Sequence, residues 1–66
     1  MNDIQKLSFF DYVNGKTLVA LNSSYHTYKV VGYNHNNSGY PLQVVRKDGI
    51  STNLRIANGF NTWRVL

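Results

Sequence analysis

Apolar and polar residues alternate strictly in one segment of the last third of the chain. The even-numbered positions of this segment are apolar or β-branched: Ile50, Thr52, Leu54 and Ile56. The positions between them are polar: Ser51, Asn53 and Arg55. Because successive side chains of a strand point to opposite faces of a sheet, this alternation predicts a strand whose first set of residues faces the core.

A short closing strand is predicted after this segment. Residues 57–61 interrupt the alternation with asparagine and glycine, and residues 62–66 are again rich in strand-forming types. We expect Trp63 and Val65 to face inward on this strand, with Trp63 as the large residue of the core. The outward set then includes Arg64, which we expect to lie beside Arg55.

Three earlier segments are rich in β-branched and aromatic residues and predict strands: residues 16–21, 25–33 and 40–47. In the second strand, Tyr28 and Val30 are expected to face one side of the sheet. The opposite side is expected to carry Lys29, Val31 and Tyr33. Gly32 predicts a bend or bulge, which lets a small sheet curl on itself.

The connections between these strands carry turn residues. Residues 34–39 are rich in Asn, Ser and Gly and predict a polar loop. Residues 47–49 are Lys-Asp-Gly and predict a tight hairpin turn. In the strand before this turn, Leu42 and Val44 define an inward face that would also contain Arg46. We therefore expect Arg46 to lie at the rim, beside Lys47 at the mouth of the hairpin.

Residues 1–15 are compatible with two structures. In the first, Asn2 or Asp3 caps a short helix that places Ile4, Leu7 and Phe10 on one face, and Gly15 ends it. In the second, residues 9–13 form a strand that turns at Asn14-Gly15, a dipeptide typical of hairpins. The helical spacing of the apolar residues favours the helix.

The composition limits the fold to one small domain. The chain has 66 residues, no cysteine, and nine aromatic residues: five Tyr, three Phe and one Trp. A chain of this length has a small core and no disulfide to support it, so the aromatic residues must supply much of the buried surface. We expect residues 1–66 to form a single domain, with residues 1–15 as a helix or arm and residues 16–66 as the β part.

Five short strands, a curled second strand and a turn before the last strand resemble an SH3-like barrel. The resemblance covers residues 16–66 and concerns the fold alone. Residues 10–12 are Phe-Asp-Tyr, a short echo of the Ala-Leu-Tyr-Asp-Tyr segment of peptide-binding SH3 domains, and the adjacent Trp pair of that family is missing. The resemblance thus implies a mainly β, five-stranded SH3-like barrel with a short N-terminal helix, and no particular ligand.

The sequence offers no arrangement typical of catalysis or metal binding. The carboxylates are Asp3, Asp11 and Asp48, and the two histidines lie nine residues apart at positions 26 and 35. General acid–base catalysis uses tuned carboxylate pairs or a histidine–carboxylate couple, and neither is evident in this spacing. We therefore expect a protein that is not an enzyme and that has no metal or cofactor.

The charge favours a polyanionic partner. Seven Lys and Arg against three Asp and Glu give a net charge of +4, which favours nucleic acid through counterion release. Basic side chains would contact phosphates and exposed tyrosines would stack on bases. The predicted DNA- or RNA-binding residues are Lys29, Tyr33, Tyr40, Arg46, Lys47, Arg55 and Arg64.

A protein partner is the alternative. Phe9 and Phe10 cannot both be buried by one face of a helix, so one of them is expected to mark a contact with a partner or a second copy. Such a chain would be an adaptor or inhibitor, and its frequent asparagine suits a phage accessory protein aimed at a host factor. We expect a cytoplasmic monomer or homodimer, because the chain has no membrane-spanning stretch and no signal-peptide pattern.

Overall fold

The computed structural model describes residues 1–23 and 25–66 in full. It contains one α-helix, five β-strands and a short 3-10 helix: α1 Asp3–Val13, β1 Thr17–Ala20, β2 Ser23–Tyr33, β3 Leu42–Arg46, β4 Ser51–Leu54, η1 Gly59–Asn61 and β5 Trp63–Val65. The protein is therefore mainly β with a short N-terminal helix, as the sequence predicts. All five expected strands are present, and their ends differ from the expected ones by at most two residues.

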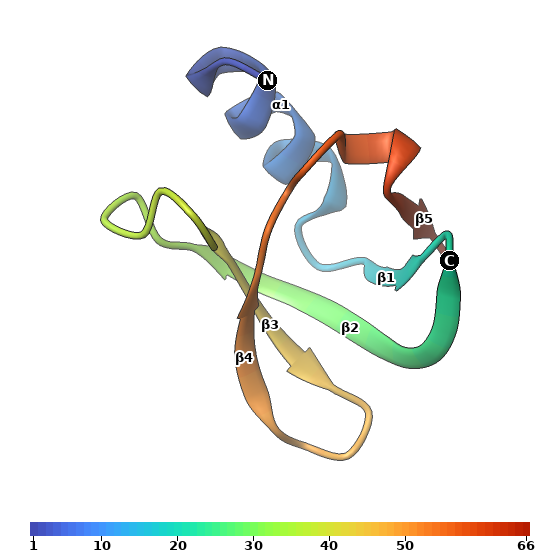
Figure 1. Cartoon of the computed structure of the whole chain (residues 1–66). Coiled ribbons are helices and arrows are strands. Elements are labelled where there is room, and N and C mark those ends of the chain that lie inside the picture. Colours follow the sequence, from blue (N-terminus) through green and yellow to red (C-terminus); the bar gives the residue numbers. More distant parts are fainter.

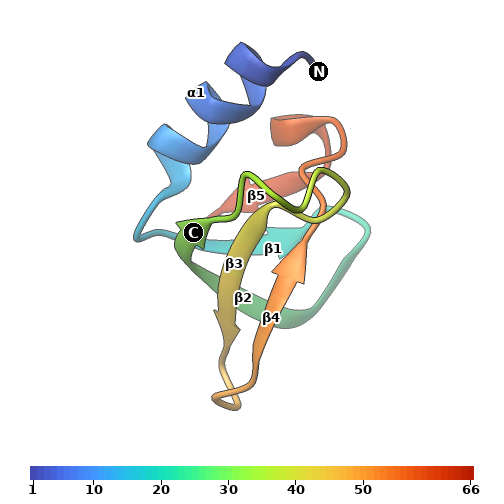
Figure 2. The ribbon, with the colours of Figure 1, turned by 90° about the vertical axis from the view of Figure 1, so that its left-hand side faces the viewer.

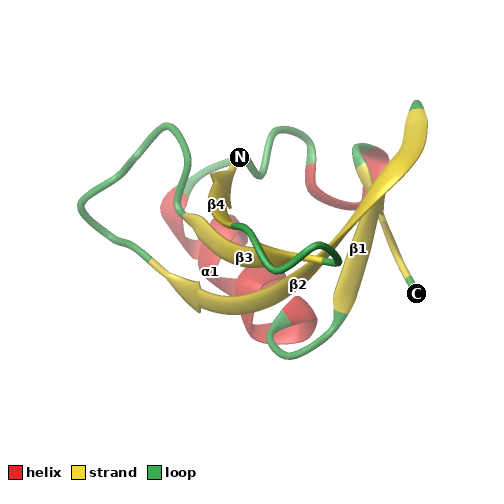
Figure 3. Ribbon diagram, turned by 90° about the horizontal axis from the view of Figure 1, so that it is seen from below, coloured by secondary structure: helices red, strands yellow, loops and turns green.

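The five strands form one antiparallel sheet in the order β4-β3-β2-β1-β5 (Figure 1). The long strand β2 lies in the middle and curves, so that the sheet curls around one side of the molecule (Figure 3). Strands β4 and β5 are the two edges of this open sheet. Among the residues described, no helix is long and apolar enough to cross a membrane.

A bulge in β2 changes which side chains face the core. Val30 pairs with Val44 of β3, and the next paired residue is Gly32 rather than Val31. Val31 is thus the extra residue, and it is exposed. One inserted residue reverses the alternation beyond it. Tyr33 therefore pairs with the buried Leu42 and packs against the core, which corrects the expected outward position of Tyr33.

The helix forms because its first turn is capped. The Asn2 side chain accepts a hydrogen bond from the Gln5 amide, and the Gln5 side chain accepts one from the Asn2 amide, at 2.8 and 3.0 Å. Such reciprocal bonds satisfy amides that lack partners at a helix start. The helical alternative for residues 1–15 is confirmed.

The face that the helix buries differs from the predicted one. Phe9 and Val13 are buried and Phe10 packs against the core, whereas Leu7 is exposed and Ile4 is 76% exposed. Phe9 and Val13 are four residues apart and Phe10 and Val13 are three apart, so the three side chains lie on one side of the helix. Phe10 lies on both the expected and the observed buried face. The observed face is rotated about the helix axis by about a third of a turn from the expected one, so the expected face was wrong.

Gly15 ends the helix and starts the sheet. It has a φ of +81° after an extended Asn14, and the Lys16 amide bonds to the Val13 carbonyl at 2.8 Å. This is the geometry of a type II turn, in which glycine tolerates the positive φ without strain. The Gly15 amide also donates to the Val30 carbonyl, which ties the turn to the centre of β2.

The core lies toward the end of the sheet that carries α1. It contains buried residues from the helix, from β1, β2, β3 and β5, and from the segment after β4: Phe9, Val13, Leu18, Val30, Leu42, Val44, Ile56 and Trp63. The indole N–H of Trp63 donates to the Arg55 carbonyl at 2.9 Å. This bond connects β5 to the residue that follows β4. The predicted core position of Trp63 is confirmed.

The hairpin of β3 and β4 extends beyond this core (Figure 2). Leu54 pairs with Leu42 and Thr52 with Val44, so their side chains share the expected inner face. Burial nevertheless decreases from Leu54 back toward the hairpin turn, because the turn projects away from the helix. Thr52 is exposed and Ile50 is 52% exposed, so the predicted burial of these two residues was wrong.

Candidate functional site

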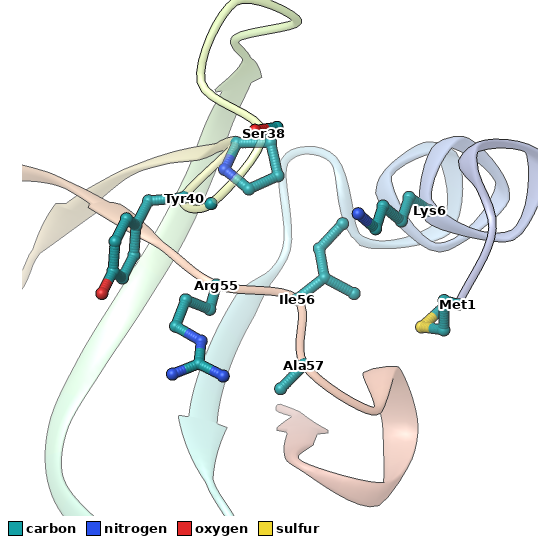
Figure 4. Close-up of a pocket in the computed structure, with 9 residues that line it drawn as sticks. Met1, Lys6, Ser38, Tyr40, Arg55, Ile56 and Ala57 are labelled. Carbon is teal, nitrogen blue, oxygen red and sulfur yellow. The ribbon is translucent and has the colours of Figure 1, made fainter.

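The helix, the loop between β2 and β3, and the segment after β4 meet around a pocket of about 440 Å³. It combines two basic side chains, Lys6 and Arg55, with the ring of Tyr40. Figure 4 shows the Tyr40 ring and the Arg55 guanidinium extending in the same direction, while Lys6 points across the pocket toward Ile56. The remaining lining is small or apolar: Met1, Ser38, Gly39, Pro41, Ile56 and Ala57.

Each of these three side chains is positioned by a different part of the fold. Lys6 lies on the capped helix, one turn before the buried Phe9. Tyr40 is held at the end of its loop, where its amide donates to the Asn37 side chain at 3.0 Å. Arg55 follows β4, and its carbonyl is bonded by the indole of Trp63. Tyr40 as a whole remains 50% exposed, so a ligand can reach it from solvent.

The lining of the pocket carries positive charge and no carboxylate, although Asp3 lines the adjoining space together with Lys6. Within residues 1–23 and 25–66, the one ion pair joins Arg46 to Asp48. None of the residues described as lining the pocket is acidic, and both Lys6 and Arg55 line it. A site with two cations and an aromatic ring can attract an anion and stack a planar group.

A second pocket of about 300 Å³ adjoins the first one. The two pockets share Lys6, Ser38 and Pro41, and the second is also lined by Tyr33 and His35. Tyr33 is held on both sides: its ring centroid lies 5.2 Å from that of Phe10 and 4.8 Å from that of His35. The predicted Tyr33 is therefore a partly buried wall of this second pocket rather than an open stacking platform.

Two other predicted residues lie at the hairpin end. Arg46 is half-buried at the rim, as expected, and its guanidinium donates two hydrogen bonds to Asp48. The hydrogen bonds from Arg46 lower the pKa of Asp48, with further contributions from the Ile50 amide and from the charges of Arg46 and His26, and they outweigh a desolvation that raises it. Lys47 is exposed in the turn. The charge of Arg46 is thus largely compensated.

The remaining predicted basic residues are distributed over the sheet. Lys29 is exposed on β2, opposite Val45 of β3. Arg64 is exposed on β5, opposite Val19 of β1. Strands β4 and β5 are not paired in the sheet, and Arg55 and Arg64 line different pockets, so the two arginines do not belong to one pocket.

Of the two phenylalanines predicted to contact a protein, Phe9 belongs to the core. Its side chain is 3% exposed, and its ring packs against Phe60 at 4.9 Å between centroids. Phe10 is partly buried against Tyr33. The helix accommodates both because it lies across one end of the curled sheet. Neither ring offers the open surface that the prediction required.

Lys6 is the pocket residue that sequence reasoning missed. Its position three residues before Phe9 would have placed it on the inner side of the helix if the buried face had been read from Phe9 and Val13. The apolar Ile4 and Leu7 pointed to a different face. Whether Lys6 lines the pocket thus depends on which side of the helix faces the core, and tertiary packing decides that.

The described residues contain no group of three or more histidine or acidic side chains that could hold a metal ion. Comparison of the chain with profiles of known families, with characterised proteins and with solved structures finds no match. The pocket of Lys6, Tyr40 and Arg55 is therefore assessed on its chemistry alone.

Proposed function

We propose that this chain is a small, non-enzymatic module that binds single-stranded nucleic acid, and that the pocket of Lys6, Tyr40 and Arg55 is its centre. The observation that carries the proposal is that the half-exposed Tyr40 shares a pocket with two cations, Lys6 and Arg55, and that the described lining of this pocket has no carboxylate. A base would stack on Tyr40, and the flanking phosphates would contact Lys6 and Arg55. The net charge of +4 would assist the approach.

A single strand suits this site better than a duplex. The bases of a single strand are available for stacking, whereas those of a duplex are stacked on each other and must be read through a groove. The pocket presents a single ring and lies in a recess between a helix, a loop and a strand end. Recognition through phosphates and one stacked base would depend little on sequence.

We also propose that the curled sheet is an SH3-like barrel. The strand order, the bulge in β2 and the 3-10 turn before β5 support this assignment. In such a barrel the loop after β2, the helix and the end of β4 would form one rim. The candidate pocket would then be a rim site supported by a rigid sheet, as is common for binding sites formed by loops.

The test is titration of a fluorescent twelve-nucleotide thymidine oligonucleotide at salt concentrations from 50 to 200 mM. We expect Tyr40→Ala to weaken binding by about 1–3 kcal/mol, roughly five- to 150-fold. Lys6→Ala and Arg55→Ala should each reduce the slope of log affinity against log salt by about 0.7, the value for one phosphate contact of a single strand.

Lys29→Ala and Lys47→Ala are charge-matched controls outside the pocket. If the pocket is the binding site, these variants keep the slope within about 0.3 of the parent value. Equal losses for all four lysine and arginine variants would instead indicate a diffuse basic surface and contradict a defined pocket. Absence of binding at 50 mM salt would refute nucleic-acid binding altogether.

A further inference from the structure

The outer edge of β5 has backbone groups without a partner strand. On the inner side, the Leu21 amide donates to the Thr62 carbonyl and the Leu66 amide to the Thr17 carbonyl, both at 2.9 Å. Hydrogen-bonded pairs alternate along an antiparallel ladder, so the amide and carbonyl of Arg64, between these two pairs, also point to β1. Those of Trp63 and Val65 therefore point outward. Of the strands described, only β1 pairs with β5.

An apolar groove of about 520 Å³ lies along this edge. Tyr12 of α1, Leu21 after β1 and Phe60 of η1 form its walls, together with the residues of β5. Phe60 and Leu21 are 53% and 55% exposed. The Phe60 ring is nevertheless fixed, because it packs edge-on against Tyr12 and Phe9 with centroid distances of 5.4 and 4.9 Å. One wall of the groove is therefore held by aromatic packing within the chain.

The charge around the groove is positive. Arg64 lines it directly, and the Lys16 ammonium lies 4.8 Å above the ring of Tyr12. The groove lining, as far as the structure describes it, contains no acidic residue. The ligand with complementary charge would therefore carry carboxylates next to its apolar side chains.

A second copy of this chain would fit the edge poorly. If two β5 strands paired antiparallel with Arg64 at the centre, the two Arg64 side chains would lie opposite each other, and like charges in that position destabilise a sheet. Each copy also has a net charge of +4. A separate acidic partner has neither of these disadvantages.

We propose that the outer edge of β5 binds an extended, acidic and apolar segment of another protein, which adds to the sheet as a sixth strand. The segment would bond to the backbone of Trp63 and Val65. One of its apolar side chains would enter the groove beside Phe60, and a carboxylate would pair with Arg64. Strand addition of this kind combines backbone bonds for affinity with side-chain pockets for specificity.

The probe for this proposal is a fluorescent seven-residue peptide in which glutamate and valine alternate. Its binding is compared with that of a lysine–valine peptide and with that of a glutamate–valine peptide N-methylated at alternate residues. We expect both comparison peptides to bind at least tenfold more weakly, because one has the wrong charge and the other lacks backbone donors. Equal binding of all three peptides would overturn the proposal.

Hydrogen exchange locates the contact. In the protein alone, the Arg64 amide should exchange slowly and the amides of Trp63 and Val65 quickly, since only the former is bonded to β1. The acidic peptide should slow exchange at Trp63 and Val65 at least tenfold. Slow exchange at both sites in the protein alone, together with a dimeric mass in solution, would show that a second copy occupies the edge, and the proposal would be wrong.

Charge reversal at the groove provides the decisive variant. Arg64→Glu should bind the lysine peptide at least fivefold more tightly than the glutamate peptide, which reverses the preference of the parent protein. Arg55→Glu is the matched control: it should leave peptide binding within twofold while it abolishes oligonucleotide binding at the other pocket. If Arg64→Glu keeps the original preference and Arg55→Glu reverses it, the peptide site lies at the Tyr40 pocket and not at β5.

Discussion

The two ends of the sheet both carry basic residues, yet they differ in charge compensation and in burial. At the hairpin end, Arg46 is paired with Asp48, and the tip of β4 extends beyond the core with an exposed Ile50. At the helix end, Lys6 and Arg55 share a pocket with no acidic residue in its described lining, and that end is built on buried Phe9 and Trp63. Net charge alone therefore does not locate a candidate site, whereas the lining of a pocket does: two basic side chains share a pocket without an acidic lining residue at the end of the sheet where the core is buried.

The largest expected difference between the ends is in stability. Phe9→Ala should reduce the free energy of unfolding by about 3–5 kcal/mol, the usual range for a buried phenylalanine. Ile50→Ala should change it by less than about 0.5 kcal/mol, as for other surface substitutions. Urea unfolding followed by the fluorescence of Trp63 measures both.

Phe9→Leu serves as a milder variant in case Phe9→Ala does not fold. It keeps most of the apolar volume, so its loss should be below about 1.5 kcal/mol. Equal losses for Phe9→Ala and Ile50→Ala would mean that the two ends are equally packed, and the comparison between them would fail.

The charge difference can be removed by adding a carboxylate to the pocket. Ser38→Asp places a negative charge in the lining shared with Lys6 and Arg55, and we expect oligonucleotide affinity to fall about tenfold at 50 mM salt. Ser51→Asp makes the same change at the hairpin end and should alter affinity less than about twofold. Oligonucleotide titration measures both variants. If Ser51→Asp reduces affinity more than Ser38→Asp, the binding site lies at the hairpin and not at the pocket.

The cap of α1 affects the helix end specifically. Asn2→Ala removes the side-chain oxygen that accepts the hydrogen bond from the Gln5 amide and should reduce the free energy of unfolding by about 1 kcal/mol. Asn53→Ala, on the exposed part of β4, is the control and should change it by less than about 0.5 kcal/mol. Thermal unfolding monitored by circular dichroism measures both, and a larger loss for Asn53→Ala would contradict the assigned cap.

The smallest expected effect is a pH dependence at the hairpin end. The pKa of Asp48 is lowered in the folded chain, so the carboxylate contributes stability above its unfolded pKa of about 4. That contribution is lost as the pH falls through the lower folded pKa, when Asp48 takes up a proton and the bonds to Arg46 weaken. NMR titration of the Gly49 and Ile50 amides should show this step, and Asp48→Asn should lack it.

Strand positions could be predicted from the sequence because alternation and turn residues are local properties. The Lys-Asp-Gly turn, the polar loop and the Trp63 core position were all correct for this reason. Depth of burial was not predictable from alternation. Thr52 pairs with the buried Val44 and so lies on the inner face, as the alternation predicts. It is nevertheless exposed, because this part of the hairpin extends beyond the helix.

The candidate site was predictable only in part. Tyr40 and Arg55 were identified from residue type and strand position, and the fold brings them together. The sequence indicated a bulge at Gly32, but the face of Tyr33 was predicted as if the alternation continued; the extra residue Val31 reversed it. The helix face that carries Lys6 was also predicted wrongly, because Phe9 and Val13, rather than Ile4 and Leu7, pack on the core. Which face of a helix is buried depends on tertiary packing and is not a local property of the sequence.

The bulge at Val31 also has a consequence for how the chain finds its native pairing. An eleven-residue strand without irregularities could slide along β3 by two residues and still present a similar face. One unpaired residue lies between Val30 and Gly32. If β2 slid along β3, this bulge would face a different part of β3, and backbone hydrogen bonds on both sides of the bulge would be lost. The extra residue therefore favours a single pairing register of β2 and β3, the two longest strands of the sheet.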